Sequence, residues 1–476
     1  MKIGVIGSGP AGASAALTFL NAGYAVHLFD LGFKDSTSTD IEFLRTSPNT
    51  SKFKLLDGEI FPYDLNEFNL ISGPIQEKSW FTSKALGGFS TVWGATWSPF
   101  EALITKDWQS AYKKANEMVF PALEDSYPPG RSFSQIDVSE ICSCFDFLAS
   151  DTFEYKSRKS VFWNIRISSS SLAVSSNSCI ACGKCQSGCP TSAIWSSKEL
   201  IRKCNSFANF EIITGSFVKT FSEESDGVNL NTSNGVVKVD ILYIACGPVA
   251  TGALILRSAH GSGSLALSDT RMITIPFLRL RSNKAHEGSF SLSGREIRFL
   301  SKDAIATSAY LQLYAHVDEF SDRVKGQFPK FLGRFIEFAL SLLSSRLYVG
   351  LLYLDSRISG SLRLSLGAGL VVEPQGLGAL PKNMTKIVQA MTALRSHYGL
   401  WPIWKFAKIG AVGDSYHLGR LTGVEISENG ELNNSRRIFV VGSAGLSEIE
   451  PGPITMTAMA HAIKTAVNHI EQLPKF

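Results

Sequence analysis

The stretch KIGVIGSGPAGASAALTFLNAGYAVHLFD, residues 2–30, decides the fold of this chain. An apolar strand runs into Gly7-x-Gly9-x-x-Gly12, a helix of small residues follows, and a second apolar strand ends at Asp30. Gly7 permits a tight turn, Gly9 lets a pyrophosphate approach the backbone, and Gly12 allows the helix to pack closely on the strand. The free amides at the start of the helix attract phosphate, and Asp30 is placed to accept hydrogen bonds from ribose hydroxyls. The stretch therefore predicts a Rossmann-type dinucleotide site, although the motif alone does not choose between NAD and FAD.

Composition indicates a globular protein of more than one unit. The 476 residues are 44% hydrophobic and 18% charged, which suits a cofactor domain packed on a substrate domain. The formal charge of +4 is too small and dispersed to predict nucleic-acid binding. Because residues 2–6 already form an apolar strand and no signal sequence or twin arginine is visible, we expect a cytoplasmic protein.

The most hydrophobic stretch, residues 331–354, does not predict a membrane span. Arg334, Glu337 and Arg346 interrupt it, and charged residues are costly inside a bilayer. Spacings of three and four instead predict an amphipathic helix whose apolar face enters the core, with contact to a membrane surface as the less favoured alternative. The residues that define this face are Phe331, Phe335, Phe338 and Leu342.

From about residue 288 to residue 366 the chain alternates apolar and polar residues. The segments SFSLSGREIRFL, SAYLQLYAHVDEF and SGSLRLSL have the pattern of half-buried antiparallel strands. Serine-rich runs at residues 168–178 and 258–268 are typical of connections between units. We expect a sheet-based substrate domain.

Four further segments favour FAD over NAD. They are LGGFSTVWGA (86–95), DILYIACGPVATGALILRSA (240–259), YHLGRLTG (416–423) and RRIFVVGSAGLSEIEPGPITMTAMAHAI (436–463). In these segments the chain resembles the glucose-methanol-choline (GMC) oxidoreductase family. The resemblance covers about half of the chain and concerns the FAD-binding portions.

The resemblance implies an α/β fold, with a discontinuous FAD-binding Rossmann-type domain and a second, mainly antiparallel-sheet substrate domain. The FAD domain would comprise residues 1–105, 206–265 and 409–476, residues 106–205 would form an insert with a cysteine cluster, and residues 266–408 would form the substrate domain. A glycine-rich turn would let backbone amides reach the flavin, and the amides that start the last helix would face its pyrimidine end. Besides the first glycine loop, the residues implied in FAD binding are Gly87, Gly88, Ser90, Trp93, Val218, Gly442, Pro453, Ile454 and Thr455.

His417 stands at the place of the family's catalytic histidine. A neutral imidazole with a pKa near 6.5 could take the hydroxyl proton of an alcohol. The sequence departs from the family at Gly452, where a second His or Asn is usual, and at Gly442-Ser443, where an acidic residue is usual. His461, two turns further along the last helix, is expected to pack or to contact solvent.

The segment CIACGKCQSGCP has the spacing C-x2-C-x2-C-x3-C followed by proline. This is the ferredoxin spacing for a [4Fe-4S] cluster held by Cys179, Cys182, Cys185 and Cys189. Zinc, a disulfide or a relic loop without metal remain alternatives. The cysteine before the proline can serve a different cluster in ferredoxins, so Cys142, Cys144 and Cys204 are other candidates for the fourth ligand, whereas Cys246 is expected in a buried strand.

Together these features predict an FAD-dependent alcohol dehydrogenase. The substrate would be a small alcohol, such as a sugar or polyol, and electrons would leave through the cluster to an external acceptor such as ferredoxin or a quinone. Two alternatives stay open: a ferredoxin-fed flavin reductase of a carbonyl or double bond, and an electron-transfer subunit without catalysis, which Gly452 would favour.

Overall fold

The computed structural model describes most of the chain. The described residues are 1–32, 83, 85–91, 93–121, 134–137, 145–156, 162–175, 178–180, 185, 189, 191–259, 263–280, 291–301, 308–315, 329, 333–367, 369–376, 384–413, 415 and 417–473.

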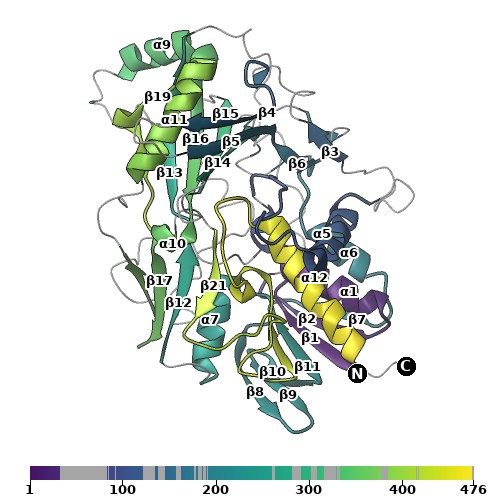
Figure 1. Cartoon of the computed structure of the whole chain (residues 1–476). Coiled ribbons are helices and arrows are strands. Elements are labelled where there is room, and N and C mark those ends of the chain that lie inside the picture. The colour runs from purple at the N-terminus through teal and green to yellow at the C-terminus, as the bar shows by residue number, and fades with distance from the viewer. Residues whose placement is uncertain are drawn as a thin grey trace.

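A five-stranded parallel sheet forms the dinucleotide domain (Figure 1). Its order is β22 (Ile438–Val440), β11 (Ile241–Ile244), β1 (Lys2–Ile6), β2 (Ala25–Phe29) and β7 (Phe210–Ile213). All four pairings are parallel. Three segments that are far apart in the sequence therefore build one sheet, which confirms the predicted discontinuous α/β fold.

Helices cover one face of this sheet. The first helix, α1 (Pro10–Asn21), packs on α12 (Thr455–Gln472) and α6 (Lys198–Cys204), and α12 also packs on α5 (Lys106–Val119). The small residues of α1 are buried, as close helix packing requires. The N- and C-terminal segments consequently meet in one layer (Figure 1).

A second core adjoins the other face. It joins the sheet to the antiparallel strands β8 (Val218–Glu224), β9 (Gly227–Thr232) and β10 (Gly235–Val239), and to α7 (Pro248–Arg257). The same core receives a four-stranded antiparallel sheet. The order of this sheet is β18 (Leu370–Gln375), β17 (Ser361–Leu366), β12 (Ser264–Asp269) and β21 (Leu418–Thr422).

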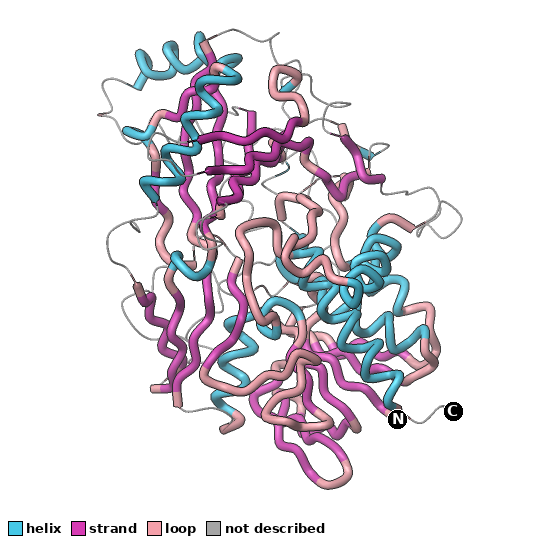
Figure 2. The backbone as a smooth tube through the Cα atoms, in the orientation of Figure 1, coloured by secondary structure: helices cyan, strands magenta, loops and turns pink. Residues whose placement is uncertain are grey.

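The largest sheet is antiparallel and lies away from the dinucleotide sheet (Figures 1 and 2). Its order is β19 (Leu400–Pro402), β13 (Met272–Arg279), β16 (Leu347–Leu354), β15 (Ala309–Ala315), β14 (Ser293–Ser301), β5 (Phe162–Ser169) and β4 (Asp151–Lys156), with β20 (Lys408–Ile409) also paired to β13. This sheet confirms the predicted second domain. Strands β4 and β5 come from residues 106–205, the segment predicted to be an insert.

The remaining elements are α11 (Met384–Tyr398), whose apolar side chains enter the core of the large sheet, and shorter segments. The shorter segments are η2 (Gly88–Thr91), the pair β3 (Ser134–Asp137) and β6 (Ser171–Val174), α9 (Gly333–Leu343), η10 (Ser344–Arg346), α10 (Ser356–Ser359), η11 (Trp404–Phe406) and η12 (Gly442–Gly445).

The two faces of the large sheet differ in chemistry. Ile297, Leu311 and Leu352 lie opposite one another on adjacent strands and enter an apolar core shared with α11. Because side chains alternate across a strand, the neighbouring positions face the other way. Several of these positions are polar, and the side chains of Arg298 and Gln312 hydrogen-bond to residues 96–99.

The predicted core face of the amphipathic helix is wrong. In α9, Phe335, Phe338 and Leu342 are 70%, 62% and 64% exposed. The hydrophobic stretch divides instead into this helix and the largely buried strand β16. Phe331 lies outside the described residues. Among the helices that the structure describes, none has the length and apolar composition needed to cross a bilayer.

Candidate functional site

The glycine loop after β1 has the shape that a pyrophosphate requires. Gly7 has φ +102°, and a Cβ there would lie 2.6 Å from the carbonyl oxygen of Ala245. A Cβ on Gly12 would collide with the carbonyl of Gly7. A Cβ on Gly9, in contrast, would meet nothing within 4 Å. Packing within the chain therefore requires glycine at positions 7 and 12. Gly9 instead borders open space at the start of α1, where its backbone is available to a ligand.

Buried serines hold the second glycine turn against this loop. The Gly87 amide donates to Ser8 Oγ at 2.8 Å, and the Ser197 amide donates to Ser90 Oγ at 2.9 Å. Ser197 Oγ donates to the Ser8 carbonyl at 2.9 Å. A Cβ on Gly88 would lie 3.4 Å from the Cα of Gly9. The two turns expected to bind FAD therefore lie together, and Ser8 and Ser197 are positioning residues that the glycine motifs alone do not reveal.

Asp30 clamps the same loop. Its Oδ2 accepts from the Ser8 amide at 2.7 Å, and its Oδ1 accepts from the Gly32 amide at 2.6 Å. Burial raises the pKa of the Asp30 carboxyl, and these hydrogen bonds oppose the rise. The Asp30 carbonyl accepts from the Ser216 amide at 3.1 Å, which places the start of β8, and Val218 with it, next to Asp30.

The C-terminal segment closes the site from another side. Gly442, with φ +78°, approaches the first turn of α1, since a Cβ there would lie 2.9 Å from Ala11 Cβ. Ile454 precedes α12 without a side-chain cap, and Thr455 begins the helix. The backbone amides of this first turn, which follow Pro453, therefore have no side-chain cap and remain able to bind an anion, as predicted for this helix start.

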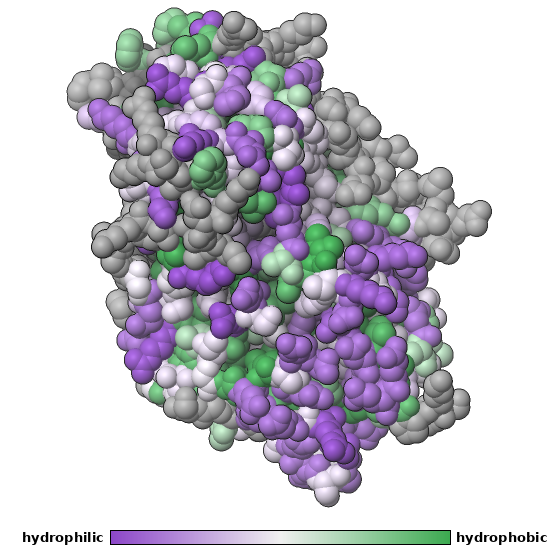
Figure 3. Space-filling view, viewed as in Figure 1, coloured by the Kyte–Doolittle hydropathy of each residue, from purple (hydrophilic) through white to green (hydrophobic). Residues whose placement is uncertain are grey.

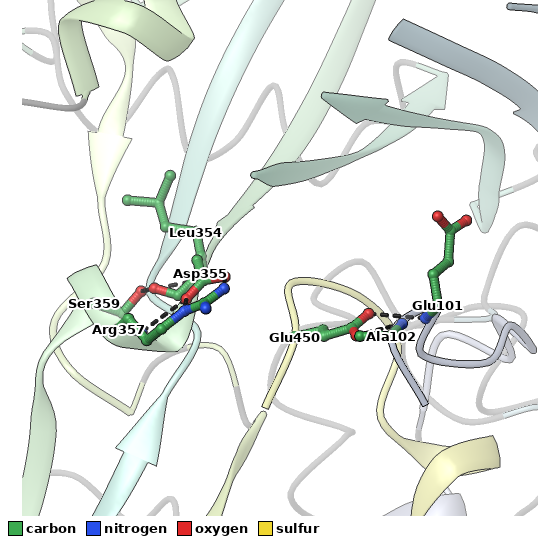
Figure 4. A network of polar contacts seen from close by, with 7 residues as sticks. All are labelled: Glu101, Ala102, Leu354, Asp355, Arg357, Ser359 and Glu450. Carbon is green, nitrogen blue, oxygen red and sulfur yellow. Dashed lines mark hydrogen bonds and ion pairs between the residues drawn. The ribbon is translucent and has the colours of Figure 1, made fainter. Parts of the chain in front are cut away.

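A carboxylate fixes the loop that leads into α12. Glu450 accepts hydrogen bonds from the amides of Glu101 at 2.8 Å and Ala102 at 2.7 Å (Figure 4). In the same view, buried Asp355 caps α10 and pairs with Arg357 directly after β16. Gly452 follows Glu450 with φ +153°, and a Cβ there would meet nothing within 4 Å. The missing side chain at position 452 thus leaves open space beside a firmly held loop.

His417 stacks on a tyrosine of the large sheet. The rings of His417 and Tyr353 are parallel within 18°, with centroids 4.7 Å apart. His417 Nδ1 is buried and makes no hydrogen bond to any residue that the structure describes. Burial lowers the pKa of His417 to about 4. This lowering corrects the expected value near 6.5, because an enclosed imidazole is held in its neutral form.

Polar residues of the sheet connect His417 to the predicted flavin-binding segment. The hydroxyls of Tyr353 and Tyr314 both donate to Gln312 Oε1, at 3.4 and 2.9 Å. Gln312 Nε2 donates to Thr96 Oγ1 at 3.1 Å, and a Cβ on Gly94 would lie 3.7 Å from the Tyr314 hydroxyl oxygen. Gln312 and Tyr314 were not predicted as site residues, although both occupy polar positions at every second residue of SAYLQLYA.

A buried aspartate holds the loop that carries His417. Asp269 Oδ1 accepts from Ser415 Oγ at 2.6 Å, and Asp269 Oδ2 accepts from the Gly413 amide at 2.9 Å. Ser415 Oγ in turn accepts from the His417 amide at 2.9 Å. On the other side, a Cβ on Gly419 would lie against the carbonyl of Ser443. These contacts bring the histidine beside the 442–453 segment. His461 is separate from the site: it is buried and stacks on Trp108, as packing would predict.

The cysteine segment offers thiol donors, but its full geometry is not described. Cys179, Cys185 and Cys189 are half-buried and pack against the edge of the apolar core, while Cys182, Cys142 and Cys144 lie outside the described residues. Burial raises the pKa of Cys185 to about 11, and the charges of Cys189 and Cys179 add to the rise. The Ala193 amide lies 3.1 Å from Cys189 Sγ, as hydrogen bonds to cluster sulfurs do. Among the described residues alone, no three potential ligands converge on a metal position.

The residues that flank the cysteine segment, Ala173 and Trp195, hydrogen-bond to the predicted flavin-binding segment at Trp93 and Ala95. The Ala173 amide donates to the Ala95 carbonyl, and the Trp195 amide donates to the Ala173 carbonyl. Trp93 Nε1 donates to the Trp195 carbonyl at 2.7 Å, and the two indole rings are 6.1 Å apart. Trp93 is therefore half-buried at the junction between the two predicted cofactor regions.

Comparisons with known proteins concern the fold and the cysteine segment. Residues 172–195 match the family model described as a 4Fe-4S binding domain. No curated protein sequence matches the chain. The crystal structure of pyridoxine 4-oxidase from Mesorbium loti is similar with a TM-score of 0.60 and 14% identity, and the similarity covers 99% of this chain and 100% of that one. The chain thus has the fold of this oxidase and carries a segment that resembles a 4Fe-4S binding domain.

Proposed function

We propose that the protein is an FAD-dependent oxidoreductase that oxidises an alcohol, with His417 as the proton acceptor. The observation that carries the proposal is the path from His417 through Tyr353 and Gln312 to Thr96. The path supports the proposal because it links His417 to Thr96, the residue directly after the predicted flavin-binding segment 86–95, although the two residues are more than 300 positions apart in the sequence. The neighbour's name, pyridoxine 4-oxidase, supports an alcohol as the substrate class.

The residues present fit FAD. Open space borders Gly9, the amides at the starts of α1 and α12 lack side-chain caps, and the second glycine turn lies on the first. When bound, FAD supplies an acceptor for the hydride that leaves the alcohol carbon. His417, neutral above about pH 4, takes the hydroxyl proton, so that the alcohol loses one hydride and one proton and becomes a carbonyl.

In this proposal His417 is held by groups other than the start of α12. Tyr353 holds the imidazole by stacking, and the Asp269–Ser415 contact fixes its backbone. The chain therefore orients its base from the sheet and from the loop rather than from the start of α12.

A [4Fe-4S] cluster held by Cys179, Cys182, Cys185 and Cys189 would supply a one-electron outlet to an external acceptor such as ferredoxin or a quinone. The match over residues 172–195 and the Cys189 to Ala193 contact support this part. The contact between Trp93 and Trp195, which lies between the two predicted cofactor regions, supports electron transfer between the two cofactors.

Anaerobic titration tests the proposal. Protein purified without oxygen is mixed with sugars, polyols and pyridoxine, and the flavin absorbance near 450 nm is followed at roughly neutral pH. We expect one alcohol class to bleach the flavin without added reductant. Bleaching only by reduced ferredoxin would favour the reverse reaction, and flavin that no alcohol reduces would favour an electron-transfer subunit.

A further inference from the structure

The face of the large sheet that carries Tyr353 changes in chemistry from strand to strand. On β14 and β15 this face is polar and enclosed, since Glu296, Tyr310 and Gln312 are 4%, 0% and 4% exposed. Gln312 also accepts from two tyrosine hydroxyls and donates to Thr96. This half of the face is therefore closed to the hydroxyl groups of a substrate.

On β13 and β16 the same face is apolar and partly open. The two strands are directly paired, and their alternate positions point the same way as Tyr353. Of the even-numbered positions 272–278 and the odd-numbered positions 347–351, only Thr274 is polar, and none contributes to the hydrophobic cores of the described residues. We call the half-buried apolar members the apolar strip: Met272, Pro276 and Leu278 on β13, and Leu347 and Leu351 on β16.

The apolar strip begins at the proposed base. Met272 lies directly opposite Tyr353, whose ring stacks on His417. At the rise of a β-strand, Leu347 at the start of β16 is roughly 20 Å from Tyr353. The two strands run side by side from the α9 end of the large sheet toward α10 (Figure 1). The strip is therefore long enough to contact much more of a molecule than its reacting carbon.

The arrangement of the apolar strip is that of a pocket wall. On the outer surface seen in Figure 3, hydrophobic residues occur in small groups among hydrophilic ones. The strip is instead continuous, and at Leu351 it adjoins the enclosed half of the face, because Leu351 lies opposite Gln312. Small-molecule sites combine such mainly apolar walls with a few polar groups that fix orientation, here His417 and Thr274.

We propose that the apolar strip binds the apolar body of the alcohol whose proton His417 accepts. The inference rests on the proposed function and narrows its substrate class to alcohols that carry an alkyl chain or apolar rings beyond the reacting carbon. The alcohol still loses one hydride and one proton, so the product is an apolar aldehyde or ketone. A sugar or polyol would place its other hydroxyls against Met272 and Leu351, where no side chain could replace their hydrogen bonds to water.

Alcohols of increasing length test the strip. Anaerobic flavin reduction is followed by stopped flow with ethanol, n-butanol, n-hexanol and n-decanol, and with glucitol, the polyol whose chain is as long as that of n-hexanol. Burial of each CH2 group favours binding by about fourfold, so the reduction rate constant divided by Kd should rise at least about a hundredfold from ethanol to n-decanol. Glucitol should react at least about tenfold less efficiently than n-hexanol.

A polar substitution within the strip separates binding of the chain from catalysis. Leu351→Asn keeps a side chain of similar length and should reduce the efficiency with n-decanol by at least about tenfold, but that with ethanol by less than about threefold. Damage to the stack of Tyr353 on His417 would slow both alcohols equally. The matched control is Leu366→Asn, at a leucine that is 44% exposed on β17, and it should leave both efficiencies unchanged.

The outcomes distinguish this inference from the proposed oxidation. Faster reduction by glucitol than by n-hexanol, no dependence on chain length, or an equal effect of Leu351→Asn on ethanol and n-decanol would overturn the strip and leave the oxidation in place. If no alcohol reduces the flavin, the oxidation fails, and decyl methyl ether, which has no hydroxyl proton, tests the strip alone. Its binding, followed by flavin absorbance, should weaken at least about tenfold in Leu351→Asn, and absence of binding to the wild type would overturn the strip.

Discussion

The imidazole of His417 lies parallel to the phenol ring of Tyr353, with 4.7 Å between ring centroids. The histidine follows the 410–415 loop, and the tyrosine comes from the centre of the large sheet. Their contact joins the two domains at the point where the proposed chemistry occurs. Because the face of an aromatic ring cannot exchange a proton with an imidazole nitrogen, we regard Tyr353 as a positioning residue.

Replacing Tyr353 separates stacking from hydrogen bonding. Tyr353→Leu removes the ring under His417, and misplacement of a catalytic group slows catalysis by about ten- to a hundredfold. Tyr353→Phe keeps the ring and loses only a 3.4 Å contact to Gln312, so it should stay close to the wild-type rate. Stopped-flow flavin reduction by alcohol measures both. Equal rates in Tyr353→Leu and the wild type would remove the positioning role.

The pH profile should be flat near neutrality. A pKa of about 4 leaves His417 neutral above that pH, so lowering the pH from 8 to 5.5 should change the reduction rate by less than about 10%. A histidine with the ordinary pKa of about 6.5 would lose roughly tenfold over the same range. The rate should fall only as the pH approaches 4, because protonated imidazole cannot accept a proton. An inflection near 6.5 would contradict the burial of this ring.

Gly9→Val should yield folded protein without FAD. The Gly9 backbone, at φ −60° and ψ 176°, accepts a side chain, and the added Cβ would meet nothing in the chain within 4 Å. The valine would instead fill the space expected for the pyrophosphate. Gly333→Val, at the start of α9, is the matched control because it also faces open space. Flavin content per folded chain measures the effect, and full occupancy in Gly9→Val would disprove this FAD site.

Iron content tests the cysteine cluster. Anaerobically purified protein should contain about four iron atoms per chain, and serine at Cys179, Cys182, Cys185 or Cys189 should lower that number while FAD stays bound. Cys204→Ala, in the buried α6, should leave iron unchanged unless Cys204 is the fourth ligand. Absence of iron after reconstitution would end the cluster proposal, and zinc in its place would support the tetrahedral alternative.

The sequence predicted those features that patterns of neighbouring residues determine, namely the glycine turn and several strands. The turn at Gly7, Gly9 and Gly12 is a property of consecutive residues, and the strands β14, β15 and β17 follow from alternation within a few residues. Alternation does not say which strands pair. The addition of β4 and β5 to the large sheet therefore lay beyond the sequence pattern, as did the stack of His417 on Tyr353.

Two errors have the same origin. The spacing in α9 showed that an apolar face exists but not whether another element covers it, and the structure leaves Phe335 and Leu342 exposed. The sequence suggested the ordinary histidine pKa for His417, but burial by segments that are distant in the sequence lowers this pKa. Both properties arise from tertiary packing.

Removal of the imidazole tests whether His417 is the proton acceptor. His417→Ala should retain FAD and slow flavin reduction by alcohol by about a hundredfold or more, because Gly452 offers no second side chain to accept the proton. The matched control is His397→Ala, since His397 also stacks on an aromatic ring, Phe153, at 4.7 Å but lies on the exposed side of α11. We expect the anaerobic single-turnover rate to fall in His417→Ala and to stay unchanged in His397→Ala. A His417→Ala enzyme that reduces its flavin at close to the wild-type rate would contradict this expectation and show that His417 is structural.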